Sequence, residues 1–208
     1  DTIAKLHNAD FKSIGLSDYG KYENYMARQI ARWSKQYKDS ETTLIPEMDN
    51  LIEWLPQNIP PGEETSIVHG DFRLDNMVFD KNSNEVIAIL DWELSTLGHP
   101  IADFTYHMMT WRMPLGVQGI GILGANLDEL NIPNENEYAE AYYQKTNRNE
   151  IHNWDFFLAY NMFRLAGITQ GIAGRVRDGT ASSDQAKQYG AFVPILSQMA
   201  WKIVENIK

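Results

Sequence analysis

Three polar side chains that could bind a metal ion or transfer a proton lie at the ends of a predicted β-hairpin. The hairpin consists of two apolar runs, Met77–Phe79 and Val86–Leu90, joined by the polar turn Asp80–Glu85. Apolar runs on both sides of a short polar turn are typical of a hairpin. Asp71 and Asn76 lie in the loop before the first run, and Asp91 directly follows the second run. We therefore expect the hairpin to bring these three side chains together.

The residue types indicate phosphoryl transfer. A carboxylate and an amide oxygen, here from Asp91 and Asn76, suit a hard cation such as Mg²⁺, which takes its remaining ligands from water and substrate phosphates. The other carboxylate, Asp71, is then free to accept a proton from a hydroxyl nucleophile. The alternative is a purely local role, because Asp and Asn often satisfy backbone groups of a turn. The combination of HGDxxxxN, hairpin and LDWE favours the chemical interpretation.

Helices are expected on both sides of this stretch, with a short strand, Ser66–His69, leading into it. Apolar spacing, caps, prolines and glycines set their limits. The expected helices are residues 1–9 as the end of a helix, a helix after an N-cap at Ser17 that carries Tyr22 to Tyr37, Leu44–Leu55, Pro100 to about Thr110, Glu135–Thr146, Trp154 to about Arg177, and about Ser183–Ile207 with a kink or break at Pro194. Residues 58–64 and 111–132 are expected to be irregular. The pattern predicts one domain, residues 1–208, of α+β class that is mainly α.

The composition of the chain limits the classes of binding partner that are expected. The formal net charge of −10 argues against a nucleic-acid or anionic-membrane surface, which needs clustered Lys and Arg. The chain has no cysteine, which fits a cytoplasmic protein, and it has no run of about 18 apolar residues that would span a membrane. Because it starts without Met, inside an expected helix, we expect a fragment of a longer protein.

The catalytic stretch resembles a known family of kinases. Residues 69–76, HGDFRLDN, resemble the catalytic loop of aminoglycoside phosphotransferase-like kinases, and residues 89–93, ILDWE, resemble their metal-binding segment. Residues 97–103, LGHPIAD, are similar to a third element of that family, and all three agree in order and spacing. The sequences FRLDN and ELSTLGHP, the loop LDELNIP (127–133) and the YxxxYxxxT helix after it point to the branch related to domains fused to acyl-CoA dehydrogenases. The resemblance covers nearly the whole chain.

The resemblance implies a role for each residue of the motifs. Asp71 would be the catalytic base that orients or deprotonates the substrate hydroxyl. Asn76 and Asp91 would hold Mg²⁺ against the phosphates of the co-substrate ATP. His69 and Asp103 would brace the catalytic loop. The fold would be the C-terminal lobe of a protein-kinase-like structure.

Three further polar residues of the motifs have open roles. Arg73 and Asp75 lie inside the loop, where they would either face substrate or be exposed charges without a fixed role. His99 departs from the aspartate that many family members have at this position, and we interpret it as structural.

Two alternatives to a kinase stay open. One is a non-catalytic module with a kinase-like fold that binds without turnover, and the other is a metal-dependent hydrolase using His69, Asp71, Asp91 and His99. No VAIK-like strand and no glycine loop precede His69, so the chain resembles a C-terminal lobe without its N-terminal lobe. We therefore expect little kinase activity from it alone, and an exposed apolar face where the N-terminal lobe would pack could make it a homodimer. The acceptor would be a small-molecule hydroxyl, with a hydroxyacyl compound or CoA ester favoured.

Several other patterns are interpreted as structural. Gly119, Gly121 and Gly124 spell GxGxxG, but no strand–helix context of a dinucleotide site surrounds them. Asp80, Asn82 and Asn84 imitate the start of an EF-hand loop, although Glu85 stands where glycine is required, so a hairpin turn is expected. Charged side chains on the late helices, Arg164, Arg175 and Arg177, are interpreted as surface charge.

Overall fold

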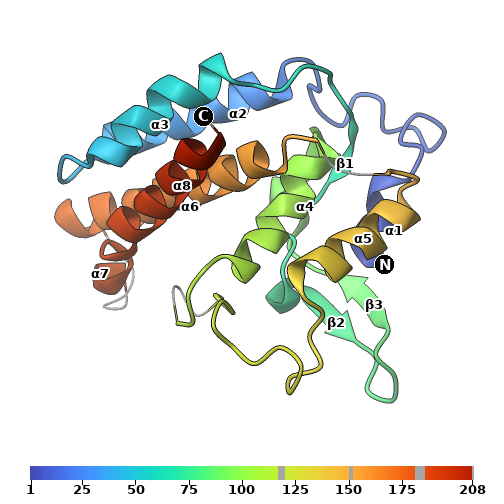
Figure 1. The fold of residues 1–208 in the computed structure, drawn as a ribbon. Coiled ribbons are helices and arrows are strands. Elements are labelled where there is room, and N and C mark those ends of the chain that lie inside the picture. Colours follow the sequence, from blue (N-terminus) through green and yellow to red (C-terminus); the bar gives the residue numbers. More distant parts are fainter. Residues whose placement is uncertain (117–119, 150–151, 181–185, 208) are drawn as a thin grey trace.

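Long helices and short strands occupy different parts of the molecule. The computed structural model describes residues 1–116, 120–149, 152–180 and 186–207 (Figure 1). The helices are α1 (Thr2–His7), α2 (Tyr25–Ser40), α3 (Pro46–Gln57), α4 (Pro100–Met108), α5 (Glu135–Lys145), α6 (Trp154–Arg177), α7 (Ala186–Tyr189) and α8 (Phe192–Ile207). The strands are β1 (Ser66–Val68), β2 (Met77–Phe79), β3 (Val86–Ile89) and β4 (Thr96–Gly98). In Figure 1, α2, α3, α6 and α8 form one side, and α1, α5 and the β2–β3 hairpin form the other, with α4 between them.

The four strands form two separate antiparallel pairs. The predicted hairpin is present: β2 pairs with β3, with Met77 opposite Ile89 and Val78 opposite Ala88. The second pair joins β1 to β4, with Ile67 opposite Leu97. Strand β4 was not predicted, because its three residues carry no period that a sequence can show. These two pairs set the entry and the exit of the stretch that holds Asp71 and Asp91.

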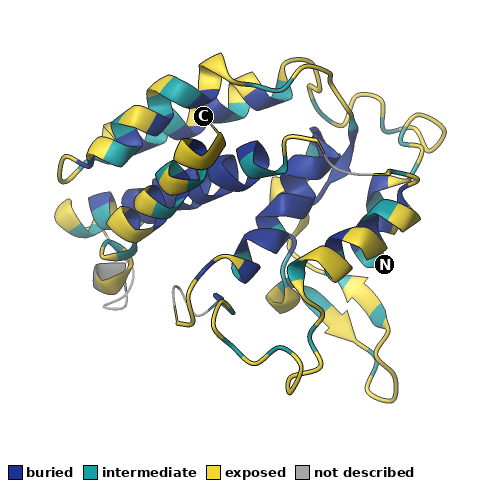
Figure 2. Ribbon diagram, viewed as in Figure 1, coloured by how far each residue is buried: buried dark blue, intermediate teal, exposed yellow. Residues whose placement is uncertain are grey.

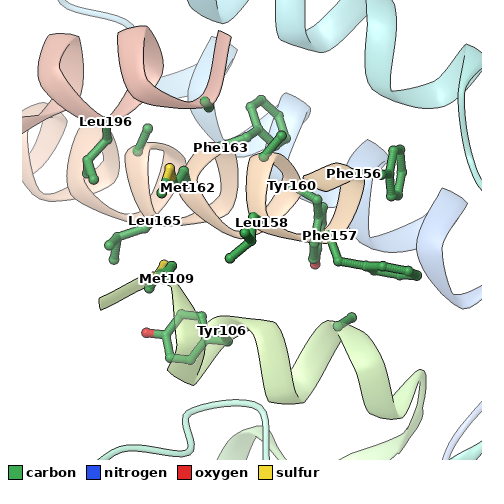
Figure 3. Packing of buried hydrophobic residues seen from close by; sticks show 14 of the residues in the cluster. Tyr106, Met109, Phe156, Phe157, Leu158, Tyr160, Met162, Phe163, Leu165 and Leu196 are labelled. Carbon is green, nitrogen blue, oxygen red and sulfur yellow. The ribbon is translucent and has the colours of Figure 1, made fainter. Parts of the chain in front are cut away.

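Helix α6 is the centre of the hydrophobic core. Its residues from Phe156 to Gly167 are buried on all sides, and Figure 2 shows it dark blue over most of its length. In Figure 3, its side chains meet Tyr106 and Met109 near α4 on one side and Leu196 of α8 on the other. Helix α2 approaches closely because α6 has glycines there; a Cβ on Gly174 would lie 2.8 Å from the Ser40 side chain. A helix that is apolar all round is a core helix.

The start of α2 was predicted wrongly. The helix begins at Tyr25 and not after Ser17, and residues 11–24 form turns. The chain passes so close to β4 at Gly20 that a Cβ there would lie 2.0 Å from Oγ1 of Thr96. The backbone N–H of Asn24 then donates a hydrogen bond to Oε1 of Glu63 at 2.6 Å. Both contacts are long-range, so the local pattern could not indicate them.

Prolines explain two smaller differences. Helix α3 begins at Pro46 and not at Leu44, because the residue before a proline is disfavoured in helical conformation, and Ile45 is extended at φ −126°. The final helix is split, as predicted, but the break lies at Gly190 and Ala191, and Pro194 occupies the first turn of α8. Proline is tolerated there because the first-turn N–H groups have no partner within the helix. The predicted start at Ser183 lies outside the described residues.

The remaining expectations on local structure agree with the structure. The turn Asp80–Glu85 closes the hairpin, with the Asn82 backbone N–H donating to Oδ1 of Asp80 at 2.7 Å. Asn134 caps α5 in a capping box with Glu137. Gly119 of the GxGxxG pattern lies outside the described residues, and Gly121 packs its backbone against Pro114. Among the helices that the structure describes, none has the length and apolarity required to cross a membrane.

Candidate active site

Asp71 and Asn76 are joined at the two ends of one loop. The Asn76 side chain donates from Nδ2 to the Asp71 backbone oxygen at 2.9 Å and to its carboxylate Oδ2 at 3.2 Å. A short 3-10 turn over Leu74–Asn76 brings the two residues together. Because both contacts use Nδ2, the amide oxygen Oδ1 of Asn76 points elsewhere and stays available as a ligand.

The hairpin brings Asp91 to the same place. The backbone N–H of Leu90 donates to the Asn76 backbone oxygen at 2.8 Å, so the residue before Asp91 is directly paired with Asn76. Asp91 itself has a left-handed backbone, with φ 62° and ψ 57°. Few residues other than glycine adopt this conformation, and those that do are often found at functional sites. Its side chain is exposed.

His69 connects the loop to the segment before Asp91. Its buried ring accepts a hydrogen bond at Nδ1 from the Asp71 backbone N–H at 3.2 Å, which leaves the proton on Nε2. Nε2 then donates to the backbone oxygen of Leu90 at 2.9 Å. The ring lies against Trp92, with centroids 4.9 Å apart. One side chain thus holds both predicted functional segments in register.

Asp103 holds the backbone at the start of the loop. Its carboxylate accepts the N–H of His69 at Oδ2 and that of Gly70 at Oδ1, both at 2.8 Å, and Oδ2 also accepts Nε2 of His7 at 3.2 Å. Burial of this carboxyl would raise its pKa, but the hydrogen bonds from His7 and the two backbone groups prevail and lower the pKa below its usual value. Asp103 is therefore a buried carboxylate with full hydrogen bonding.

Arg164 contacts the same loop from α6, and its interpretation as surface charge is wrong. The residue is 7% exposed, and Nη2 donates to the Gly70 backbone oxygen at 2.5 Å. The guanidinium lies over the rings of Tyr106 and Trp33, at 4.7 and 5.5 Å from their centroids. A lone charge within the apolar stretch from Phe156 to Ile168 was the available signal of burial. Arg175 and Arg177 are exposed, as expected.

Tyr106 is a second residue beside Asp71 that sequence reasoning missed. It is buried on α4, and burial raises the pKa of its hydroxyl to about 12. The charge of Arg164 opposes this shift, whereas the charge of Asp71 and a hydrogen bond to it contribute to the rise. The hydroxyl therefore keeps its proton at neutral pH and lies beside the Asp71 carboxylate.

The other polar residues of the motifs have local partners. Arg73 and Asp75 form an ion pair with each other, and Arg73 Nε lies 2.8 Å from Oδ2 of Asp75. His99 accepts the Ile101 N–H at Nδ1 as the cap of α4, and its ring packs on Phe157. Its surroundings are therefore those of a structural residue, and it does not join Asp71. Within the described parts of the chain, no group of three or more His, Asp or Glu side chains is arranged to hold a metal ion.

The fold is that of a kinase-like phosphotransferase. A crystal structure from Ralstonia eutropha JMP134, described as a "putative aminoglycoside phosphotransferase", superimposes with a TM-score of 0.94 at 51% sequence identity. The match covers 98% of this chain and 62% of that chain. The predicted mainly helical α+β fold of kinase-like type is thereby confirmed.

The chain belongs to the phosphotransferase enzyme family known as APH, whose family model matches residues 1–144. It is 40% identical over 96% of its length to acyl-CoA dehydrogenase family member 10 of Mus musculus, and 38% identical over 95% to family member 11 of Homo sapiens. A further relative is the probable acyl-CoA dehydrogenase IBR3 of Arabidopsis thaliana, at 37% identity. The chain spans only 19%, 26% and 24% of these three proteins, respectively. The predicted relationship to this branch is confirmed.

Proposed function

We propose that this chain is the catalytic lobe of an ATP- and Mg²⁺-dependent phosphotransferase that phosphorylates a small-molecule hydroxyl. The observation that carries the proposal is the joining of Asp71, Asn76 and the segment that ends at Asp91 by the Nδ2 contacts of Asn76 and the Leu90–Asn76 backbone bond. Membership of the phosphotransferase family supports the same class of reaction. ATP and Mg²⁺ together supply the phosphoryl group and the charge that neutralises it in transfer.

The donor set fits a magnesium ion. Oδ1 of Asn76 and the carboxylate of Asp91 are hard oxygen ligands of the type that Mg²⁺ prefers. In the described part of the chain, no side chain or backbone group donates a hydrogen bond to the exposed Asp91 carboxylate, so both of its oxygens are available. In our proposal, these two residues hold the cation beside the phosphates.

Asp71 acts on the acceptor. Its carboxylate accepts a hydrogen bond from Nδ2 of Asn76, which orients it, and the Tyr106 hydroxyl lies beside it. A carboxylate so oriented accepts the proton of the attacking hydroxyl, or aligns that hydroxyl for in-line attack. His69 and Asp103 act as braces through the backbone of the loop, and Arg73 and Asp75, paired at its rim, are the substrate-side residues.

We infer the acceptor class from the relatives. Several are named acyl-CoA dehydrogenase family members, so a hydroxyacyl compound or a CoA ester is the acceptor that we propose. The absence of cysteine and the negative charge of the chain support the proposal of a cytoplasmic protein that binds neither nucleic acid nor membrane.

An apolar surface on the hairpin suggests where a nucleotide-covering lobe would pack. The hairpin surface, as we name it, consists of the exposed side chains Val78, Phe79, Ile87, Leu90 and Trp92. Exposed apolar patches commonly mark interaction sites. We propose that the N-terminal lobe covers this surface, that the isolated chain has little activity, and that its copies associate through the surface into a homodimer.

Ligand titration with thermal unfolding tests the proposal. A ligand that binds the native state raises the melting temperature, so Mg–ATP should raise that of the chain, and Asp91→Asn should abolish the shift. Asp71→Asn should keep the shift, but it should remove the transfer that is measured when the N-terminal lobe is supplied. Asp39→Asn, the same change at an exposed carboxylate on α2, is the matched control and should behave as wild type.

Each alternative function gives a different result. A shift with Mg–ATP but no transfer, also when the N-terminal lobe is supplied, would favour a binding module. A response to Mn²⁺ alone, with turnover in the absence of nucleotide, would favour a hydrolase. Ordinary kinase rates from the isolated 208 residues would contradict the proposed low activity.

A further inference from the structure

Two tyrosines on α5 each contact a histidine: Tyr142 contacts the buried His7, and Tyr138 contacts the partly buried His107. Oη of Tyr142 lies 2.7 Å from Nδ1 of His7 on α1, and Oη of Tyr138 lies 3.1 Å from Nε2 of His107 on α4. The two tyrosines are four residues apart, so they lie on the same face of the helix. In Figure 1, α5 runs beside α1 and α4.

Each histidine contacts the catalytic loop region in turn. Nε2 of His7 donates to Asp103, which accepts the N–H groups of His69 and Gly70. The His107 ring makes an edge-on contact with the Phe72 ring of the loop, with centroids 5.8 Å apart. Two separate relays therefore lead from α5 to the segment around Asp71.

The positions of the protons in these two chains of contacts follow from the groups at their ends. Asp103 is a carboxylate and only accepts, so Nε2 of His7 carries a proton. Burial raises the pKa of Tyr142, so its hydroxyl keeps its proton and pairs with Nδ1 of His7 across 2.7 Å. In the second relay, burial lowers the pKa of His107 to about 4, so this ring is neutral at pH 7 and accepts from Tyr138 at Nε2. Both relays are thus fully paired along their length.

Packing alone does not require these hydroxyls. The Tyr142 ring already stacks on Phe104 with centroids 3.8 Å apart, which a phenylalanine would reproduce. Burying a hydroxyl is unfavourable unless it is hydrogen-bonded, and a buried network restricts the conformations of its members. The hydroxyls therefore have a role in orientation beyond packing.

We propose that α5 positions the loop His69–Asn76, with Tyr142 acting through His7 and Asp103, and Tyr138 acting through His107 and Phe72. These four Tyr and His side chains are positioning residues, since none of them contacts Asp71, Asn76 or Asp91 in the described structure. The consequence for phosphoryl transfer rests on the function proposed above, whereas the effect on the loop does not.

Amide hydrogen exchange tests the proposal with a minimal change. Tyr142→Phe removes one oxygen and keeps the ring on Phe104. We expect the amides of His69 and Gly70, which donate to Asp103, to exchange at least ten times faster than in wild type. Amides of the α6 core, such as those of Leu158 and Phe163, should change by a smaller factor because they report global unfolding. Tyr189→Phe, on exposed α7, is the matched control.

A second pair of variants separates positioning from loss of stability. His7→Gln keeps a donor for Asp103 and an acceptor for Tyr142, whereas His7→Ala removes both. Slow exchange at Gly70 in His7→Gln and fast exchange in His7→Ala, relative to α6, would support the relay. Equal factors at the loop and α6, or no change at the loop in Tyr142→Phe, would overturn it. If the exchange results hold but Mg–ATP fails to bind the wild type, the proposed function fails and the positioning role stands.

Discussion

Asn161 on α6 donates a hydrogen bond from Nδ2 to Oγ1 of Thr105 on α4 across 2.9 Å, within the buried core. Arg164 lies one helical turn further along α6 and reaches the Gly70 backbone oxygen. Residues three apart share a helix face. The same face of α6 therefore binds both α4, which carries Asp103, and the loop that Asp103 binds. The core helix is thus connected to the candidate active site by direct hydrogen bonds.

Replacing Arg164 by methionine should destabilise the protein. Methionine fills a similar volume but leaves the Gly70 carbonyl oxygen without its donor, and an unsatisfied buried acceptor costs about 1–3 kcal/mol. Urea unfolding monitored by tryptophan fluorescence measures the change. Arg175→Met, on the exposed end of the same helix, should change the free energy of unfolding by less than about 0.5 kcal/mol. Equal effects of the two substitutions would contradict the contact.

Asp103→Asn should cost about 3 kcal/mol at pH 7, because an amide nitrogen cannot accept the hydrogen bonds that the carboxylate accepts from backbone N–H groups. The folded-state pKa of Asp103 is below its value in the unfolded chain. Its stabilisation is therefore present above about pH 4 and is lost as the pH falls through the lower folded-state pKa. Urea unfolding at several pH values should show the gap between wild type and variant narrowing below pH 4. Asp39→Asn, in an exposed pair with Lys35, should show a small difference at every pH.

Protonation of His99 should lower the free energy of unfolding in mild acid. Burial lowers the pKa of His99 to about 4, although Glu64 opposes the shift. The unfolded chain binds a proton at this residue near pH 6.5, so the stability present above that pH is lost as the pH falls through about 4, by up to about 3 kcal/mol. His99→Asn keeps a cap for the Ile101 N–H and does not titrate. The variant should therefore lose less stability than wild type between pH 6.5 and 4.5 in urea titrations; parallel losses would refute the assignment.

Self-association of the isolated chain should depend on the hairpin surface. Ile87→Lys places a charge among these side chains, at a position that is 62% exposed, so it should lower the dimer fraction without affecting folding. Sedimentation velocity at increasing concentration measures this fraction. Leu44→Lys, equally exposed but before α3, is the control and should leave the fraction unchanged. A wild-type chain that stays monomeric at high concentration would contradict the proposed homodimer.

Local signals predicted most of the fold. Prolines, caps and apolar spacing placed α4, α5 and α6 within a few residues, and the hairpin was placed correctly from its polar turn. The failures concern segments whose conformation depends on distant partners. Strand β4 exists because β1 lies beside it, and the late start of α2 follows from the contact of Gly20 with Thr96.

The candidate site shows the same division. Motif spacing put Asp71, Asn76 and Asp91 at the ends of the hairpin, where the structure has them. Motif spacing could not indicate that Arg164, Tyr106 and His7 contact the loop or Asp103, because these residues lie far from their partners in the sequence. The resemblance to a known family identified the motif residues, but the side chains that hold the motif residues in place are seen only in the three-dimensional structure.

The long-range origin of the supports has a consequence for the order of folding. Asp103 is 96 residues from His7 in sequence, and Gly70 is 94 residues from Arg164. Contacts of high sequence separation require large loops to close, and they tend to form late. The hairpin can form by itself within microseconds, but the loop beside it has no fixed conformation until α1, α4 and α6 have docked. We expect a refolding chain to acquire its helical content before the Asp71 carboxylate acquires its orientation, so that the geometry of the candidate site would be the last property to return.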